Sequence, residues 1–242
     1  MCYVNSLMPQ EIAVAMKQEK VTCMVVVPLF LKLIAKSIRT EAAKQSKFKY
    51  AIFKALVQFA PTLPLPLRRK LFQQVHTRFG GELKYFVCGG APLDVGLIRF
   101  FEALGIIIYQ GYGMAEASPV IATNAIDANK PGSVGRPLPG VEIAIEGCAV
   151  QGEILARGPN IMNGYFDNPE LSRKIIDADG WLHTGDIGYV DCDGYLFING
   201  RKKNIIVLGR VGCFYRDTGI TGCNEGGEVI TFMIVSIAWV QW

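Results

Sequence analysis

Hydrophobic positions near the start of the chain alternate between helical spacing and one continuous apolar run. The spacing over Pro9–Lys17 predicts a helix with proline near its first turn, where the missing N–H has no partner to lose. Amphipathic helices are also expected over 29–37, 46–59 and 66–79. The β-branched run Val21–Val27 is typical of a strand that is buried on both faces.

The chain then shows the pattern of a strand, a helix and a second strand. Leu83–Cys88 and Ile106–Tyr109 are short apolar runs, and Asp94–Leu104 between them has helical spacing. This order over so short a stretch favours parallel pairing of the two strands. Ligands of parallel sheets bind beyond the carboxyl ends of the strands, so Gly89–Pro92 and Gln110–Glu116 are candidates for a binding site.

Proline and glycine separate short alternating strands after Lys130, and one helix interrupts them at Asn168–Ile175. Asp193-Gly194 is a signal for a hairpin turn. The strands are expected at Val141–Ile145, Glu153–Arg157, Ile187–Asp191 and Tyr195–Asn199.

The pattern as a whole predicts an α/β protein. We expect residues 1–130 to form a subdomain with a parallel βαβ sheet and residues 131–202 to form a β-rich subdomain. A short hinge segment is expected at 203–208. Residues 209–242 show no clear periodicity before a final apolar run, and we expect a tail that is unrelated to the preceding subdomains.

The formal net charge of +4 is distributed unevenly over the 242 residues. Residues 1–80 hold 13 basic and 3 acidic residues, a balance of +10, whereas the rest hold 12 basic and 18 acidic residues, a balance of −6. This asymmetry indicates a basic face toward an anionic partner, such as an anionic membrane surface. The alternative is a solvated helical surface over Arg39–Lys54.

The cysteine and histidine contents limit the chemistry. Seven cysteines without C-x-x-C spacing indicate reduced packing residues of a cytoplasmic protein. Two histidines exclude a metal cluster built on histidine. We expect no signal peptide, and the apolar run Val21–Leu31 is too short for a bilayer, which needs about 20 apolar residues.

Gly111–Glu116 is the most informative short motif. It is close to the dinucleotide fingerprint G-x-G-x-x-G, but Glu116 replaces the third glycine and would repel a pyrophosphate unless a cation lay between them. The Tyr112 ring could instead stack on a base, and the Glu116 carboxylate could hold Mg²⁺ beside phosphates. The alternative is an ordinary loop with a buried tyrosine and a surface glutamate.

Three further segments have both a chemical and a purely structural interpretation. Gly89–Pro92 would let a flat ligand approach the backbone, or would simply start a helix. Asp186 could accept hydrogen bonds from both hydroxyls of a ribose, or could only form a turn. Arg201 could bond a sugar or phosphate, or belong to a solvated basic turn. His183 is expected to pack and not to catalyse, because no partner base or nucleophile is evident.

The order and spacing of these motifs resemble the AMP-forming acyl-CoA synthetase family, whose relatives include amino-acid adenylation domains and luciferases. The resemblance extends from Tyr3 to Leu208 and is greatest to the fatty-acyl branch. The matching segments are Gln110–Glu116, Gly152–Gly158, Asn163–Pro169, Gly180–Leu182, Thr184–Asp186 and Gly200–Lys203.

This resemblance implies a two-step reaction that uses ATP, Mg²⁺ and CoA. A carboxylate oxygen attacks the α-phosphate of ATP, which gives acyl-AMP and releases pyrophosphate, and the CoA thiol then displaces AMP to form a thioester. The expected acid is a fatty acid or a related carboxylic acid. Val26–Leu33 and Gly105–Gly113 are implied to line the acyl side.

The resemblance also implies roles for single residues. Tyr112 would stack on adenine, Glu116 would take part in catalysis by binding Mg²⁺, and Lys203 would be the hinge of a lid motion. Asp186 and Arg201 would hold the ribose. The implied nucleotide-binding residues are Gly90, Ala91, Pro92, Gly111, Tyr112, Gly113, Ala115, Asp186, Ile198 and Arg201.

Three departures from the family pattern bear on activity. Residues 1–80 contain no Gly/Ser/Thr-rich phosphate loop, Ala115 stands where the family usually has threonine, and the similarity ends near Leu208. Loss of a charge-stabilising contact at a reacting group lowers the rate by about 10²–10³. We therefore expect a fragment of a fatty acid–CoA ligase, truncated at both ends and inactive by itself. The alternatives are a non-catalytic nucleotide- or acyl-binding remnant and a membrane-surface protein, and no nucleic-acid partner is expected.

Overall fold

The chain forms two compact units. One consists of Met1–Ala115 with Pro119–Arg136, and the other of Glu116–Ser118 with Pro137–Trp242. The computed structural model describes residues 9–147, 151–202, 205–208, 211–216, 219–223 and 229–232, with side chains between 11 and 202 apart from 45 and 148–150. The expected hinge residue Lys203 lies outside the described residues, and the subdomain boundary expected after residue 130 stays a prediction.

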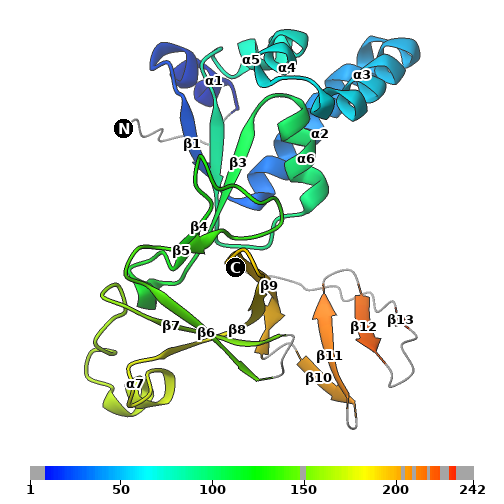
Figure 1. The fold of residues 1–242 in the computed structure, drawn as a ribbon. Helices are drawn as coiled ribbons and strands as arrows, with labels where there is room; N and C mark the ends of the chain where they lie inside the picture. The colour runs from blue at the N-terminus through cyan, green and yellow to red at the C-terminus, as the bar shows by residue number, and fades with distance from the viewer. Residues whose placement is uncertain are drawn as a thin grey trace. The chain divides into compact units, whose positions relative to one another are not determined.

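The first unit is built on a sheet with the strand order β1-β2-β3-β4-β5 (Figure 1). β1 (Cys23–Val26), β2 (Tyr85–Cys88) and β3 (Ile107–Tyr112) pair in parallel. β4 (Ala122–Thr123) pairs antiparallel with β3, and β5 (Arg136–Pro137) follows it. Helix α6 (Val95–Ala103) connects β2 to β3, so the expected βαβ unit and the α/β class are confirmed.

Most helices of this unit lie where the hydrophobic spacing placed them. α1 (Pro9–Gln18) and α3 (Lys47–Phe59) match the expected bounds closely. α2 (Pro28–Gln45) is longer than expected, because no glycine or proline interrupts it before Ser46, whose side chain caps α3. A short 3₁₀ turn, η1 (Ala60–Thr62), follows α3.

The prediction of a single helix over 66–79 is wrong. Two short helices occupy this stretch, α4 (Leu65–Leu71) and α5 (Gln73–Arg78), and they meet at Phe72. The backbone of Phe72 leaves the helical region, with φ −105° and ψ 30°, and its ring is buried in the core. The break between the two helices thus coincides with the burial of this ring, and tertiary packing prevails over the helical spacing here.

The core of the first unit lies between the sheet and the helices. Aromatic rings meet edge to face inside it, with 5.5 Å between the ring centroids of Phe86 on β2 and Phe101 on α6. The largest fully buried side chains here belong to Leu31, Leu83, Phe86, Ile98, Phe101, Leu104, Ile106 and Ile108.

The interpretation of Val21–Val27 as a strand buried on both faces is wrong for the described chain. β1 is the edge strand of the sheet, and its Val25 side chain is 78% exposed while that of Val26 is buried. Successive side chains of a strand point to opposite faces. Only the face of Val26 meets the core of this unit.

The second unit contains an antiparallel sheet in the order β6-β7-β8-β9. The four strands are β6 (Glu142–Gly147), β7 (Gly152–Arg157), β8 (Leu182–Val190) and β9 (Leu196–Arg201). β8 begins five residues before the strand expected at Ile187, so Thr184–Asp186 lie inside it and not in a loop. The expected helix is α7 (Pro169–Ile175), with Asn168 as its N-cap.

The expected hairpin between β8 and β9 is confirmed. Gly194 adopts the left-handed conformation at φ +81°. The Asp191 carboxylate accepts hydrogen bonds from the backbone N–H groups of Asp193 and Tyr195, at 3.0 and 2.9 Å. Local turn chemistry therefore sets this connection.

Residues 205–232 contain a further antiparallel sheet in the order β10-β11-β12-β13. Its strands are β10 (Ile205–Leu208), β11 (Val211–Arg216), β12 (Gly219–Cys223) and β13 (Val229–Phe232). The aperiodic sequence after residue 208 did not predict this sheet. Among the residues that the structure describes, no helix combines the length and hydrophobicity needed to cross a membrane.

One testable consequence concerns His76, which ties α5 to the end of α6. Its Nε2 lies 2.7 Å from the carbonyl oxygen of Leu104, and burial lowers the pKa of the imidazole more than this hydrogen bond raises it. The folded pKa therefore lies below the unfolded one, so the neutral ring stabilises the fold above the unfolded pKa and this contribution is lost as the pH falls. Urea denaturation should show a larger loss of unfolding free energy from neutral to mildly acidic pH in the wild type than in His76→Gln. Equal losses would contradict this role.

Candidate functional site

Two of the expected binding segments leave the sheet at the same edge. Gly89–Pro92 follows β2 and Gly111–Tyr112 ends β3, and the register pairs Cys88 with Gln110. Gly90 has φ +82°, and no heavy atom lies within 4 Å of the place where its Cβ would be. Since the side chains of Ala91 and Pro92 are also exposed, this segment offers an open, flat stretch of backbone.

The strand end at Gly111–Gly113 is packed more tightly. A Cβ on Gly113 would collide with the carbonyl oxygen of Pro119, so only glycine fits where the chain returns beside the strand. Gly111 pairs with Thr123 and Tyr112 with Ala122. The Tyr112 side chain is 9% exposed, so a base could meet only a small part of its ring.

Glu116 lies in the short 3₁₀ turn η2 (Ala115–Ala117), which begins at the exposed Ala115. Within the second unit, the Tyr165 hydroxyl donates to Glu116 Oε1 at 2.7 Å, and the Met162 N–H donates to the Glu116 carbonyl at 2.9 Å. The hydrogen bond to Glu116, together with burial, raises the pKa of the Tyr165 phenol. The half-buried carboxylate is thus held in place by a neutral donor and is the hard oxygen ligand that Mg²⁺ prefers.

Asp186 and Arg201 face each other across β8 and β9. Arg201 Nε donates to Asp186 Oδ1 at 3.0 Å, and the Asp186 side chain is buried while that of Arg201 is mostly exposed. The Thr184 hydroxyl accepts from the Asp186 N–H at 3.1 Å and donates to the Ile154 carbonyl at 2.7 Å. The sequence predicted both residues separately but not this pairing.

Ile198, the remaining expected residue on β9, is half-buried and pairs with Gly188. The register between β8 and β9 shifts between Ile187 and Gly188. Because this irregularity changes which residues oppose one another, it determines that Asp186 stands opposite Arg201.

Sequence reasoning missed Glu153, a buried carboxylate on β7. Its Oε1 accepts from the Gly185 N–H at 3.0 Å and its Oε2 accepts from Lys202 Nζ at 2.6 Å. Glu153 therefore links both Gly185, which precedes Asp186, and Lys202, which follows Arg201, to strand β7. The available signal was a single charged residue inside the otherwise uncharged run Gly152–Ala156.

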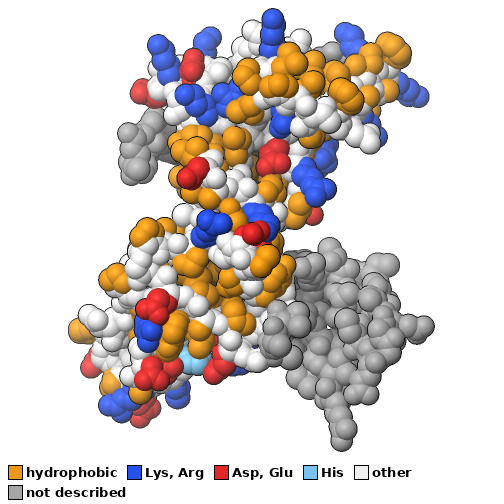
Figure 2. Space-filling model, in the orientation of Figure 1, with side chains coloured by type: hydrophobic (Ala, Val, Ile, Leu, Met, Phe, Trp, Pro, Cys, Tyr) orange, Lys and Arg blue, Asp and Glu red, His pale blue; other side chains and the backbone are white. Residues whose placement is uncertain are grey.

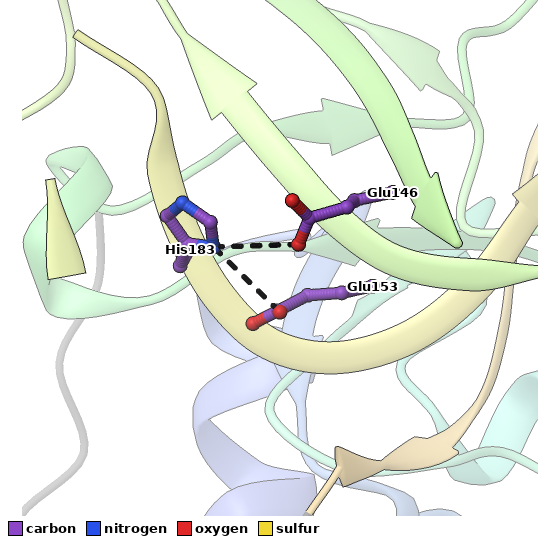
Figure 3. Close-up of side chains that lie close together, drawn as sticks. All are labelled: Glu146, Glu153 and His183. Atoms are coloured by element: carbon purple, nitrogen blue, oxygen red, sulfur yellow. Dashed lines mark ion pairs between the residues drawn. The ribbon is translucent and has the colours of Figure 1, made fainter. Parts of the chain in front are cut away.

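Glu153 also belongs to a small charged cluster with His183 and Glu146 (Figure 3). His183 Nδ1 lies 3.6 Å from Glu153 Oε2 and 3.9 Å from Glu146 Oε2, and His183 Nε2 lies 3.7 Å from Asp177 Oδ2. One ligand atom from each of the first three residues falls within 4.8 Å of the others, so the presence of only two histidines does not exclude a mixed metal site. The Lys202 ammonium already contacts Glu153, however, and this favours a cluster of ion pairs over a metal centre.

The charge of Glu153 is maintained by its neighbours. Burial by itself would raise the pKa of the carboxyl, but the Lys202 ammonium, the Gly185 N–H and His183 together hold it below its ordinary value. Hydrogen bonding to Glu153 raises the pKa of Lys202 correspondingly. Both groups are therefore charged near neutral pH.

Glu153→Gln should destabilise the second unit, because the amide leaves the Lys202 and Gly185 donors poorly matched. We expect the unfolding free energy to fall by roughly 1–3 kcal/mol at neutral pH in urea denaturation. The folded pKa is depressed, so the advantage of the wild type should shrink as the pH falls through that pKa. The matched control is Glu142→Gln, since the exposed Glu142–Arg157 pair at 2.7 Å should contribute less than about 1 kcal/mol. Equal effects of the two substitutions would contradict the role of Glu153.

Two curated proteins with a similar sequence are named as ligases. The "Long-chain-fatty-acid--CoA ligase FadD15" of Mycobacterium bovis is 41% identical over 139 residues, which are 57% of this chain and 22% of that protein. The "2-succinylbenzoate--CoA ligase" of Bacillus cytotoxicus is 38% identical over 153 residues, covering 58% of this chain and 32% of that one. This chain thus spans less than a third of the length of these curated relatives.

One solved structure has a similar fold. The crystal structure of ATP-bound MatB from Rhodopseudomonas palustris superposes with a TM-score of 0.64 at 26% identity, over 88% of this chain and 37% of that one. Residues 2–166, more than half of the chain, match the family described as "AMP-binding enzyme". The expected family resemblance is therefore confirmed: this chain belongs to the AMP-binding enzyme family.

Proposed function

We propose that this chain is the nucleotide-binding part of an ATP-dependent ligase that joins a fatty acid to coenzyme A. The observation that carries the proposal is the Asp186–Arg201 pair on adjacent strands. The carboxylate can accept from ribose hydroxyls while the exposed guanidinium beside it donates to the sugar or phosphate. The names of the curated relatives, a fatty acid–CoA ligase among them, supply the reaction class.

The sheet edge of the first unit, taken by itself, offers a surface for adenine. The open backbone of Gly90–Pro92 suits the flat face of adenine, with Gly111–Gly113 on the neighbouring strand end. Mg²⁺, when bound, would neutralise phosphate charge, and Glu116 is the oxygen ligand that this chain offers to it. The subdomains 1–130 and 131–202 and the hinge at 203–208 stay the proposed division of the chain.

The start of α2 is the segment best suited to contact the acyl chain. Val27, Leu29 and Leu33 are apolar and more than half exposed, so an alkyl chain could cover them. By contrast, Ile106 and Ile108 of the second implied segment are buried in the core and are not available to a substrate. Within the implied segment Val26–Leu33, we therefore assign acyl contact to the exposed side chains of Val27, Leu29 and Leu33.

Titration of the full chain with AMP and ATP by calorimetry tests the proposal. We expect Asp186→Asn and Arg201→Met to weaken binding by about tenfold each, because each removes a charge-assisted hydrogen bond. Glu142→Gln, which changes a carboxylate on the same sheet, should bind as the wild type does. No nucleotide affinity in the wild type, or equal affinity in Asp186→Asn, would overturn the proposal.

Ala115 gives a second test. Ala115→Thr adds a hydroxyl at the first residue of η2 and should tighten AMP binding by roughly two- to tenfold, whereas Ala115→Val, of nearly the same shape, should not.

We further expect no acid-dependent pyrophosphate release by the wild-type chain with palmitate or with 2-succinylbenzoate. Release with palmitate would make this chain an active ligase and would refute the expected inactivity, while release with 2-succinylbenzoate alone would refute the fatty-acid assignment.

A further inference from the structure

Helix α3 presents hydrophobic side chains both to the core and to the surface. Phe53, Leu56 and Val57 pack against the core of the first unit. Phe48, Ile52 and Phe59 lie on a neighbouring, exposed face and are 75%, 43% and 65% exposed. Because four and seven residues are close to whole helical turns, these three side chains form one apolar stripe along the helix.

The stripe is surrounded by positive charge. Lys47, Lys49 and Lys54 are exposed on α3, which contains no acidic residue. From Pro28 to Arg78 the chain holds eleven basic residues and one acidic residue, Glu41. That carboxylate is already paired with Lys44 at 3.0 Å and Arg78 at 3.4 Å, so it offers little to a cationic partner.

The space-filling view shows the same combination on the molecular surface. Figure 2 shows hydrophobic side chains gathered over α3 and α4, with Lys and Arg side chains at their margins. On α4, Leu67 and Leu71 are also exposed, at 47% and 40%. Aromatic and aliphatic side chains bordered by lysines are the composition of a helix that lies in the interface of an anionic bilayer.

We propose that α3 docks the first unit on an anionic membrane surface, with Phe48, Ile52 and Phe59 in the acyl boundary and Lys47, Lys49 and Lys54 at lipid phosphates. Nucleic acid would satisfy the lysines but would leave the apolar stripe exposed to water. The inference is independent of the proposed ligase activity.

Cosedimentation of the full chain with vesicles tests this inference. We expect binding to phosphatidylcholine vesicles that contain phosphatidylglycerol, and much weaker binding to pure phosphatidylcholine or at high salt. Changing Lys47, Lys49 and Lys54 together to glutamine should lower the partition coefficient by about a hundredfold, at about fivefold per lysine. The double substitution Phe48→Gln, Phe59→Gln should lower it by about tenfold or more.

Matched controls are available in the second unit. Phe166 is fully exposed there, so Phe166→Gln should leave binding unchanged, as should the paired change Arg173→Gln, Lys174→Gln on α7. Circular dichroism checks that each variant folds. Equal binding to neutral and anionic vesicles, or binding by the double phenylalanine variant equal to that of the wild type, would overturn the proposal.

A measurement on the unmodified chain gives a second test. Photoactivatable lipids in the anionic vesicles should label residues 46–59, as located by mass spectrometry. Labelling confined to other segments would overturn the proposal. A dimer seen by light scattering that the double phenylalanine substitution abolishes, without vesicle binding by the wild type, would show that the stripe is a contact between copies of the chain instead.

Discussion

The parallel register of β2 and β3 is the constraint on which the candidate site in the first unit depends. It pairs Cys88 with Gln110, so both glycine-containing segments leave the sheet side by side. The close approach continues past the strands, because a Cβ on Gly89 would lie 3.1 Å from the Gly111 carbonyl oxygen. The pairing is held in place by Phe86 and the α6 helix that packs over it. A core contact thereby determines where two exposed backbone segments can receive a ligand.

The second unit depends on a different kind of interaction, the buried carboxylate of Glu153. An unpaired charge at this depth would be strongly unfavourable, so the donors around it are required by the fold. Those donors are the Gly185 N–H and the Lys202 ammonium, which flank the two residues of the proposed ribose contact. Stability and the geometry of Asp186 and Arg201 are therefore coupled through the Glu153 side chain, and His183 Nδ1 lies 3.6 Å from the same carboxylate.

Short sequence motifs correctly predicted the elements that begin or end at a capping residue or a tight turn. Asp94 accepts from the Leu97 N–H at 3.0 Å and starts α6, Gly105 ends it at φ +83°, and Asp193-Gly194 closes the β8–β9 hairpin. The errors arose where distant packing decided the outcome. The helical pattern breaks at Phe72, whose ring is buried in the core, and Val25 is exposed because only the opposite face of β1, that of Val26, meets the core.

The sequence by itself determined the family and most of the strands and helices between residues 9 and 202, and it named residues for a proposed site, because motif spacing and periodicity are properties of neighbouring residues. Only the tertiary structure decided which of those residues meet. Asp186 faces Arg201 because of an irregular strand register, and Glu153 joins both segments because β7 lies beside β8. Tertiary packing also decided that α3 buries one apolar face and exposes the other, since the spacing of hydrophobic residues does not say which face meets the core.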